Sequence, residues 1–109
     1  MKKFVYLIIV NEVIIIKVIK YSTAWCMSCI VMDNVFCKLQ DLYDFDYISY
    51  DYDNDRDKFA GFDENEKLPI IEFVDDNNSV LVKINGEYSK KEIEDILVNL
   101  GVELKWKKL

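Results

Sequence analysis

Two cysteines three residues apart, Cys26 and Cys29, are the residues of this chain best suited to chemistry. They follow a long apolar run and open a segment with helical periodicity. At a helix start, such residues share one turn with Cα atoms about 5–6 Å apart, a span that a disulfide bridges. Free N–H groups and the helix dipole favour an anion there and lower the pKa of the first thiol. A catalyst of disulfide exchange requires a thiolate beside a partner thiol.

The same spacing also occurs in half of a zinc site and in inert cysteine pairs. Structural zinc takes four ligands, but the sequence contains no histidine and only one further cysteine, Cys37. We therefore favour redox chemistry and predict no metal. Cys37 lies eight residues after Cys29, about 12 Å along an intact helix, which is beyond the reach of a disulfide. We expect Cys37 to be a buried structural cysteine.

Length and composition predict one folded domain over residues 1–109. Hydrophobic residues make up 51% of the chain and aromatic residues 14%, which is enough for one core. The formal net charge of −6 argues against a nucleic-acid partner, because phosphate contacts need clustered Lys and Arg. Three cysteines do not suit a secreted disulfide framework, so we expect a cytoplasmic protein.

The N-terminal apolar run Phe4–Val10 superficially resembles a signal peptide. It is short, it ends at Asn11, and no small-residue cleavage site follows it. A membrane span would place Glu12, Lys17 and Lys20 in the bilayer, which is costly. We expect β structure here and no membrane contact, with export or anchoring as the alternative.

The pattern along the chain predicts strands and helices in the order β, β, α, β, short α, β, β, α. The expected strands are Phe4–Val10, Val13–Tyr21, Asp46–Asp53, Leu68–Val74 and Val80–Ile84, and the expected helices are Met27–Tyr43, a short one within Asn54–Phe62, and one after the capping box that begins at Ser89. This order implies an α/β fold, a central mixed sheet flanked by helices.

Two of these elements should position the cysteines. The nearly continuous apolar run Val13–Tyr21 is typical of a central strand buried on both faces. The helix after the motif should contact the core through an apolar stripe, namely Met27, Val31, Val35, Leu39 and Leu42.

From about Val13 to Leu100 the chain resembles a thioredoxin. The resemblance rests on Trp25-Cys26-x-x-Cys29 after the central strand, Leu68-Pro69-Ile70 about forty residues later, the hairpin, Gly86 and the capped terminal helix. It implies the thioredoxin-like fold, with Pro69 in the cis form and facing the cysteines. A trans proline at a strand start is the alternative. Leu68 would pair its backbone with an extended substrate segment.

The resemblance also implies a mechanism without a bound cofactor. Cys26 would attack a substrate disulfide, and Cys29 would resolve the mixed disulfide. Trp25 and Met27 would shape the surface on which the substrate docks. The implied function is reduction of protein disulfides by a monomer that receives electrons from a reductase or another dithiol. An oxidase or isomerase with the same cysteines, and a binding module without turnover, are the alternatives.

Three positions depart from the family pattern. Met27-Ser28 replaces Gly-Pro between the cysteines, so Ser28 could approach a sulfur or merely assist helix initiation. Lys20 stands where thioredoxins carry a buried aspartate. It would either stabilise a thiolate and make the pair more oxidising, or extend to solvent. Asn11-Glu12 is too short for the first family helix, so Phe4–Tyr21 is either an antiparallel hairpin or partly helical.

Overall fold

The computed structural model describes residues 16–63 and 65–105. Its elements are β1 (Lys17–Ser22), α2 (Met27–Gln40), β2 (Asp46–Asp51), the 3₁₀ helix η1 (Arg56–Phe59), β3 (Ile70–Val74), β4 (Val80–Asn85) and α3 (Lys90–Asn99). The strand predicted over Phe4–Val10 and the question of a first helix fall on residues 1–15, outside the described residues. Each other predicted element is present, with ends shifted by a few residues.

The four described strands form one mixed sheet in the order β2-β1-β3-β4. β1 pairs in parallel with β2 and antiparallel with β3, so the strand that precedes the cysteines is central, as predicted. β3 and β4 form the predicted antiparallel hairpin. Its turn is held by Asp75 Oδ1, which accepts hydrogen bonds at 2.9 Å from the backbone N–H groups of Asn77 and Ser79.

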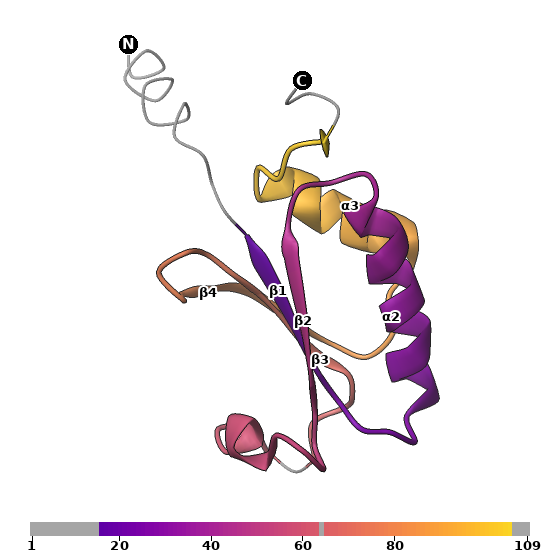
Figure 1. Ribbon diagram of the computed structural model, residues 1–109, viewed down its shortest axis with the longest axis vertical. Coiled ribbons are helices and arrows are strands. Elements are labelled where there is room, and N and C mark those ends of the chain that lie inside the picture. The colour runs from indigo at the N-terminus through magenta and orange to yellow at the C-terminus, as the bar shows by residue number, and fades with distance from the viewer. Residues whose placement is uncertain (1–15, 64, 106–109) are drawn as a thin grey trace.

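The main core lies between the sheet and the two α-helices, which cover the same face in Figure 1. Its buried members are Ile16, Val18, Met32, Phe36, Leu39, Tyr43, Phe45, Ile71, Phe73, Ile84, Ile93, Leu97 and Val102. Phe36 of α2 stacks on Tyr47 of β2 with ring centroids 5.0 Å apart. These contacts fix α2, and hence the cysteine motif at its start, against the end of the central strand.

η1 covers part of the opposite face of the sheet with an aromatic cluster. The ring of Tyr21 lies 5.5 Å from Phe59, 4.7 Å from Phe62 and 5.6 Å from Tyr50, centroid to centroid. η1 lies at the end of the molecule where α2 begins (Figure 1). This cluster therefore supports the loops that surround the cysteine motif.

The predicted apolar stripe of α2 is right for Leu39 and Val35, which contact the core, and wrong for its other three members. The residues of α2 that are buried are Cys29, Met32, Phe36 and Leu39, whereas Met27, Val31 and Leu42 are exposed. Steps of four residues advance about 40° beyond each full turn, so a line of such steps rotates away from the core. The alternating steps of three and four from Cys29 to Leu39 stay on one face.

Cys37 is exposed, so the prediction that it is buried is also wrong. It follows Phe36 directly, and adjacent helical positions point about 100° apart. In α3 the predicted capping box is present. The Ser89 side chain accepts from the Glu92 backbone N–H, and Glu92 accepts from the Ser89 backbone N–H. No helix within residues 16–63 and 65–105 is long and apolar enough to cross a membrane.

Candidate active site

The cysteine motif begins where the central strand ends. Ser22 closes β1, three residues follow, and Cys26 is the N-cap residue of α2 with an extended backbone. The Cys26 Sγ accepts a hydrogen bond from the Cys29 backbone N–H at 3.2 Å. The sulfur thus occupies the place that a capping oxygen usually fills, among the free N–H groups of the first turn. That environment stabilises negative charge on Cys26.

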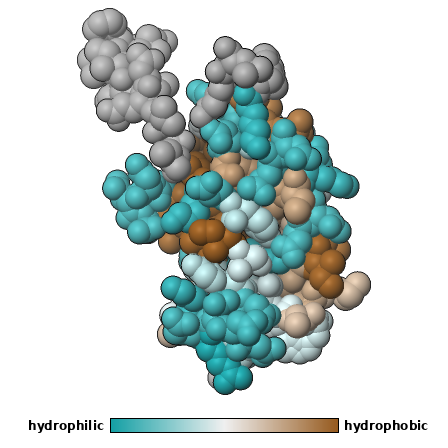
Figure 2. Space-filling model, viewed as in Figure 1, coloured by the Kyte–Doolittle hydropathy of each residue, from teal (hydrophilic) through white to brown (hydrophobic). Residues whose placement is uncertain are grey.

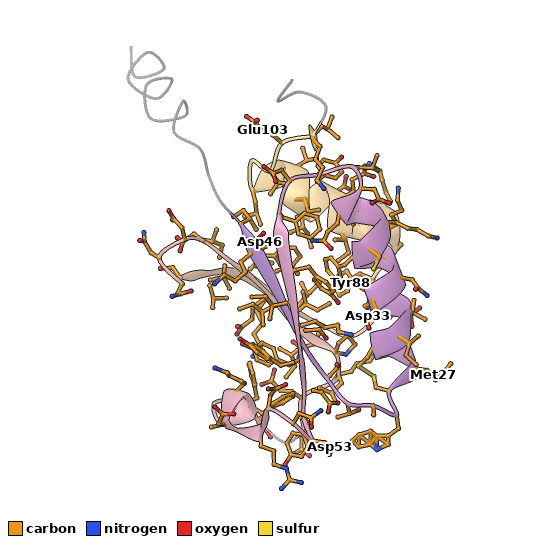
Figure 3. All side chains as sticks on the ribbon, viewed as in Figure 1. Met27, Asp33, Asp46, Asp53, Tyr88 and Glu103 are labelled. Atoms are coloured by element: carbon orange, nitrogen blue, oxygen red, sulfur yellow. A yellow bond between two sulfur atoms is a disulfide. The ribbon has the colours of Figure 1, made fainter. Side chains whose placement is uncertain are left out.

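Cys26 and Cys29 are joined by a disulfide, and their Cα atoms lie 5.2 Å apart. The bridge is visible at the start of α2 in Figure 3. Cys26 is partly exposed, whereas Cys29 is 2% exposed. The Cys26 sulfur is therefore accessible to a thiol from outside, whereas the Cys29 sulfur is buried.

Pro69 lies beside the chain that enters the motif. Tyr21 of β1 pairs with Ile70 of β3, so the antiparallel register puts Pro69 level with Ser22. The Leu68–Pro69 peptide bond is cis, as predicted. The Gly86 backbone N–H donates to the Pro69 carbonyl oxygen at 2.9 Å, so the end of the hairpin holds this loop.

Apolar side chains are exposed around the cysteines. Trp25 is 70% exposed and Met27 is 73% exposed, and Ile30 and Val31 continue this surface along α2. Figure 2 shows apolar residues at the lower right, over the first half of α2, and Figure 3 shows Met27 pointing away from the sheet. We call Trp25, Met27, Ile30 and Val31 the apolar rim.

A cavity of about 340 Å³ lies on the η1 side of the motif. It is lined by Thr23, Trp25, Tyr52, Phe59, Phe62, Asp63, Glu66, Leu68 and Ile70. Trp25 and Leu68 thus connect the cavity with the apolar rim and with the loop before Pro69.

Lys20 does not extend to solvent, which excludes the second of its two interpretations. It is 1% exposed and lies on the face of β1 that α2 covers. Its Nζ donates to the Cys29 carbonyl oxygen at 3.1 Å and forms an ion pair of 2.7 Å with Asp33 Oδ1. The Tyr47 hydroxyl donates to the same Asp33 oxygen at 2.6 Å. Burial and the hydrogen bond to Asp33 raise the pKa of Tyr47 well above its ordinary value, so its phenol stays protonated.

Several neighbours of the site were not identified from the sequence. The Ser28 hydroxyl donates to Glu87 Oε1 at 3.2 Å, and its recorded partner is therefore neither a cysteine sulfur nor a helix N–H group. Glu87 is 59 residues away, and no local pattern predicts that contact. Asp33 follows Cys29 by one helical turn, and this spacing could have identified Asp33 as a neighbour of the site. Among the described residues, no group of three or more His, Cys, Asp or Glu side chains could hold a metal.

No protein-family model matches the sequence, and no curated protein matches it. Solved structures of thioredoxins do match the fold. A malaria parasite thioredoxin-2 structure is 18% identical with a TM-score of 0.68, covering 82% of this chain and 86% of the other. A Schistosoma mansoni thioredoxin pre-protein is 16% identical with a TM-score of 0.63, covering 88% and 89%. Oxidised thioredoxin O2 from Arabidopsis thaliana is 18% identical with a TM-score of 0.65, covering 79% and 75%.

These similarities show that the chain has the thioredoxin fold, as the sequence predicted. At 16–18% identity they establish the fold and not the activity. The function is therefore inferred from the cysteine pair and its surroundings.

Proposed function

We propose that this protein is a thiol–disulfide oxidoreductase that reduces disulfides in other proteins. The observation that supports this most strongly is the Cys26–Cys29 disulfide at the start of α2, with one sulfur accessible and the other buried. An inert structural disulfide gains nothing from placing one sulfur at an exposed helix N-terminus, where a thiolate is favoured. The asymmetry suits two successive exchange steps.

In the first step the Cys26 thiolate attacks a substrate disulfide. A mixed disulfide forms between Cys26 and one substrate sulfur, and the other substrate sulfur leaves as a thiolate. In the second step the Cys29 thiolate attacks the Cys26 sulfur, which releases the second substrate thiolate and closes the Cys26–Cys29 disulfide. Two electrons pass to the substrate, and the released thiolates take protons from water.

The substrate class that we propose is a protein with an accessible disulfide in an extended segment. The backbone of Leu68 would pair with that segment, as an added strand pairs with a sheet edge. Trp25 and Met27 offer exposed apolar area beside Cys26, and the 340 Å³ cavity accommodates a side chain of the segment. Pro69 would fix the position of the segment relative to the sulfur.

The remaining parts of the proposal concern partners and location. The oxidised protein must be re-reduced by a reductase or a small dithiol, because two electrons leave it in each cycle. We propose that it acts as a monomer in the cytoplasm, without a bound cofactor. These points rest on the cysteine count and on the proposed reaction.

A second function, disulfide formation or isomerisation, is favoured by one specific observation. Lys20 carries a positive charge against the backbone of Cys29. A cation in a buried site stabilises a nearby thiolate, and hence the reduced form, which makes the disulfide a stronger oxidant. The direction of electron flow then depends on the potential of the pair and on the compartment.

The proposed activity is tested with a peptide closed by one disulfide and labelled with a fluorophore and a quencher. With dithiothreitol as electron donor, the protein should accelerate opening of the peptide catalytically. Cys26→Ser should abolish this acceleration, whereas Cys37→Ser should retain it. Equal rates with and without the wild-type protein would contradict the proposal, and retained peptide binding by Cys26→Ser would then indicate a binding module.

A further inference from the structure

We propose that the buried Lys20–Asp33 ion pair sets the redox equilibrium of the cysteine pair, with its two members acting in opposite directions. Lys20 stabilises the Cys29 thiolate, and Asp33 limits this effect by holding and partly neutralising the ammonium group. This inference rests on the proposed exchange reaction and specifies how its direction is controlled. Both are positioning residues, because they act through the cysteine pair and contact each other, the Cys29 backbone and the Tyr47 hydroxyl.

The positive charge of Lys20 lies against the backbone of Cys29. Lys20 is 1% exposed and Cys29 is 2% exposed, so both residues are largely shielded from water. The Lys20 Nζ lies 3.1 Å from the Cys29 carbonyl oxygen, on the same residue as the leaving sulfur. Electrostatic interactions are strong where water is excluded, and a buried cation needs a partner. When Cys29 is in a disulfide, its sulfur is neutral and offers the cation no such charge.

The ammonium group of Lys20 forms an ion pair with Asp33. Asp33 Oδ1 accepts both the Lys20 ammonium, at 2.7 Å, and the Tyr47 hydroxyl, at 2.6 Å. Asp33 is one turn after Cys29 and lies on the side of α2 that faces the sheet (Figure 3). Its side chain is 46% exposed, so it balances the buried cation while remaining in contact with solvent.

The exchange step shows where this charge acts. An external thiolate attacks the Cys26 sulfur and forms a bond to it, the Cys26–Cys29 bond breaks, and its electron pair leaves on Cys29 as a thiolate. A second external thiolate then releases Cys26, so the protein gains two electrons and the dithiol reagent is oxidised. The new charge appears on the residue whose backbone carbonyl oxygen accepts from the Lys20 ammonium. The ammonium then interacts with two anions, the Cys29 thiolate and Asp33.

Removal of the Lys20 charge and removal of the Asp33 charge should shift the disulfide–dithiol equilibrium in opposite directions. Without Lys20, the Cys29 thiolate has lost this cation and remains one helical turn from the Asp33 carboxylate, so the disulfide is favoured. Without the Asp33 charge, Lys20 is neutralised less, and the dithiol is favoured. A purely structural ion pair would not separate its members in this way, because loss of either one would disturb the same packing.

The experiment measures the ratio of disulfide to dithiol in glutathione buffers, in a Cys37→Ser background, near pH 8 where thiolates are populated. Lys20→Met should raise this ratio about tenfold, which is about 30 mV toward the reducing side. Asp33→Asn should lower it at least about threefold, and Lys20→Arg should stay near the wild type. The surface pair Lys91–Asp95 provides matched charge changes, and Lys91→Met and Asp95→Asn should shift the ratio little.

Shifts of opposite sign for Lys20→Met and Asp33→Asn support the proposal. Shifts of the same sign, or none beyond those of the Lys91 and Asp95 controls, overturn it even if the wild type is an active exchange catalyst. If Lys20→Met does not fold, Asp33→Asn decides, since its side chain is half exposed and an unchanged ratio would refute the proposal. Absence of any two-thiol transition in the wild type would instead refute the proposed function itself, and this inference with it.

Discussion

At the residue scale, the cysteine pair is asymmetric, and the asymmetry has identifiable causes. Cys26 has an extended backbone after the turn at Ala24 and Trp25 and caps α2 through its sulfur. Cys29 lies on the buried line of the helix that continues through Met32 and Phe36. One backbone transition, from extended chain to helix, thus separates an accessible sulfur from a protected one. Cys37 lies on the same helix but is exposed.

The first prediction separates the roles of the two sulfurs. In a Cys37→Ser background, Cys29→Ser should accumulate a mixed disulfide with a disulfide-bearing protein, because no second thiol is present to release it. Cys26→Ser should accumulate much less, because the remaining Cys29 is buried. Intact mass under non-reducing conditions measures the adduct. Adducts formed preferentially by Cys26→Ser would reverse the assignment.

The second prediction concerns Trp25, whose side chain is largely exposed beside Cys26. Trp25→Ala should leave the free energy of unfolding nearly unchanged and lower kcat/KM for the labelled peptide about tenfold, the loss of about 1.4 kcal/mol of binding. Val98→Ala on α3 removes a comparably exposed apolar residue and serves as control. If both variants keep wild-type kcat/KM, the apolar rim has no part in substrate docking.

At the element scale, the site depends on where three segments meet: the end of β1, the start of α2 and the loop before β3. The order and type of these described elements follow from sequence patterns that are local, such as alternation in strands and the capping box at Ser89. The orientation of α2 does not, because several apolar stripes fit one helix and only packing against the sheet selects between them. The stripe from Cys29 to Leu39 faces the sheet because this orientation packs Phe36 against Tyr47 and Phe73.

Contacts between segments distant in sequence explain what could not be predicted at the site. The Lys20–Asp33 pair depends on how closely α2 packs on β1, and the Ser28–Glu87 contact joins positions 59 residues apart. A lysine within an apolar strand is unusual and drew attention to Lys20, but the sequence does not identify its partner. The cysteines and Pro69 could be located in advance because their order and spacing form a recognisable set.

The third prediction tests the loop that supports Pro69. Gly86 has φ of 90°, a conformation that other residues avoid, and an added Cβ would lie 3.1 Å from the Lys67 side chain. Gly86→Ala should therefore lower the free energy of unfolding by about 1–2 kcal/mol. Gly61→Ala is the matched control, because an added Cβ there meets nothing within 4 Å. Equal stabilities for the two variants in denaturant titrations would contradict this account of the loop.

At the scale of the whole molecule, a thioredoxin-fold sheet is enclosed by α-helices on one face and by the η1 aromatic cluster on part of the other. Each side holds a tyrosine hydrogen-bonded to a carboxylate: the partly buried Tyr47 to Asp33 under α2, and the buried Tyr21 to Glu72, at 3.1 Å, on the η1 side. That residues 1–109 form one domain stays a prediction.

The fourth prediction is a loss of stability in alkali. Burial, followed by the neighbouring carboxylates, raises the pKa values of Tyr21 and Tyr47 above the ordinary value of about 10. Their contribution is fully present below pH of about 10 and is lost above it, because the unfolded tyrosines ionise first. Denaturant titrations between about pH 8 and 11 should show this decline. Tyr47→Phe should make the decline shallower, and an unchanged slope would exclude tyrosine ionisation as the cause.

The most direct test of the central claim is the redox equilibrium of the purified protein in glutathione buffers, read by thiol alkylation and intact mass. We predict one transition in which two thiols, Cys26 and Cys29, titrate together while Cys37 is alkylated throughout. A midpoint near −270 mV would place the protein with reducing thioredoxins, and one between about −180 and −120 mV with isomerases and oxidants. No two-thiol transition, or one that involves Cys37, would contradict the account.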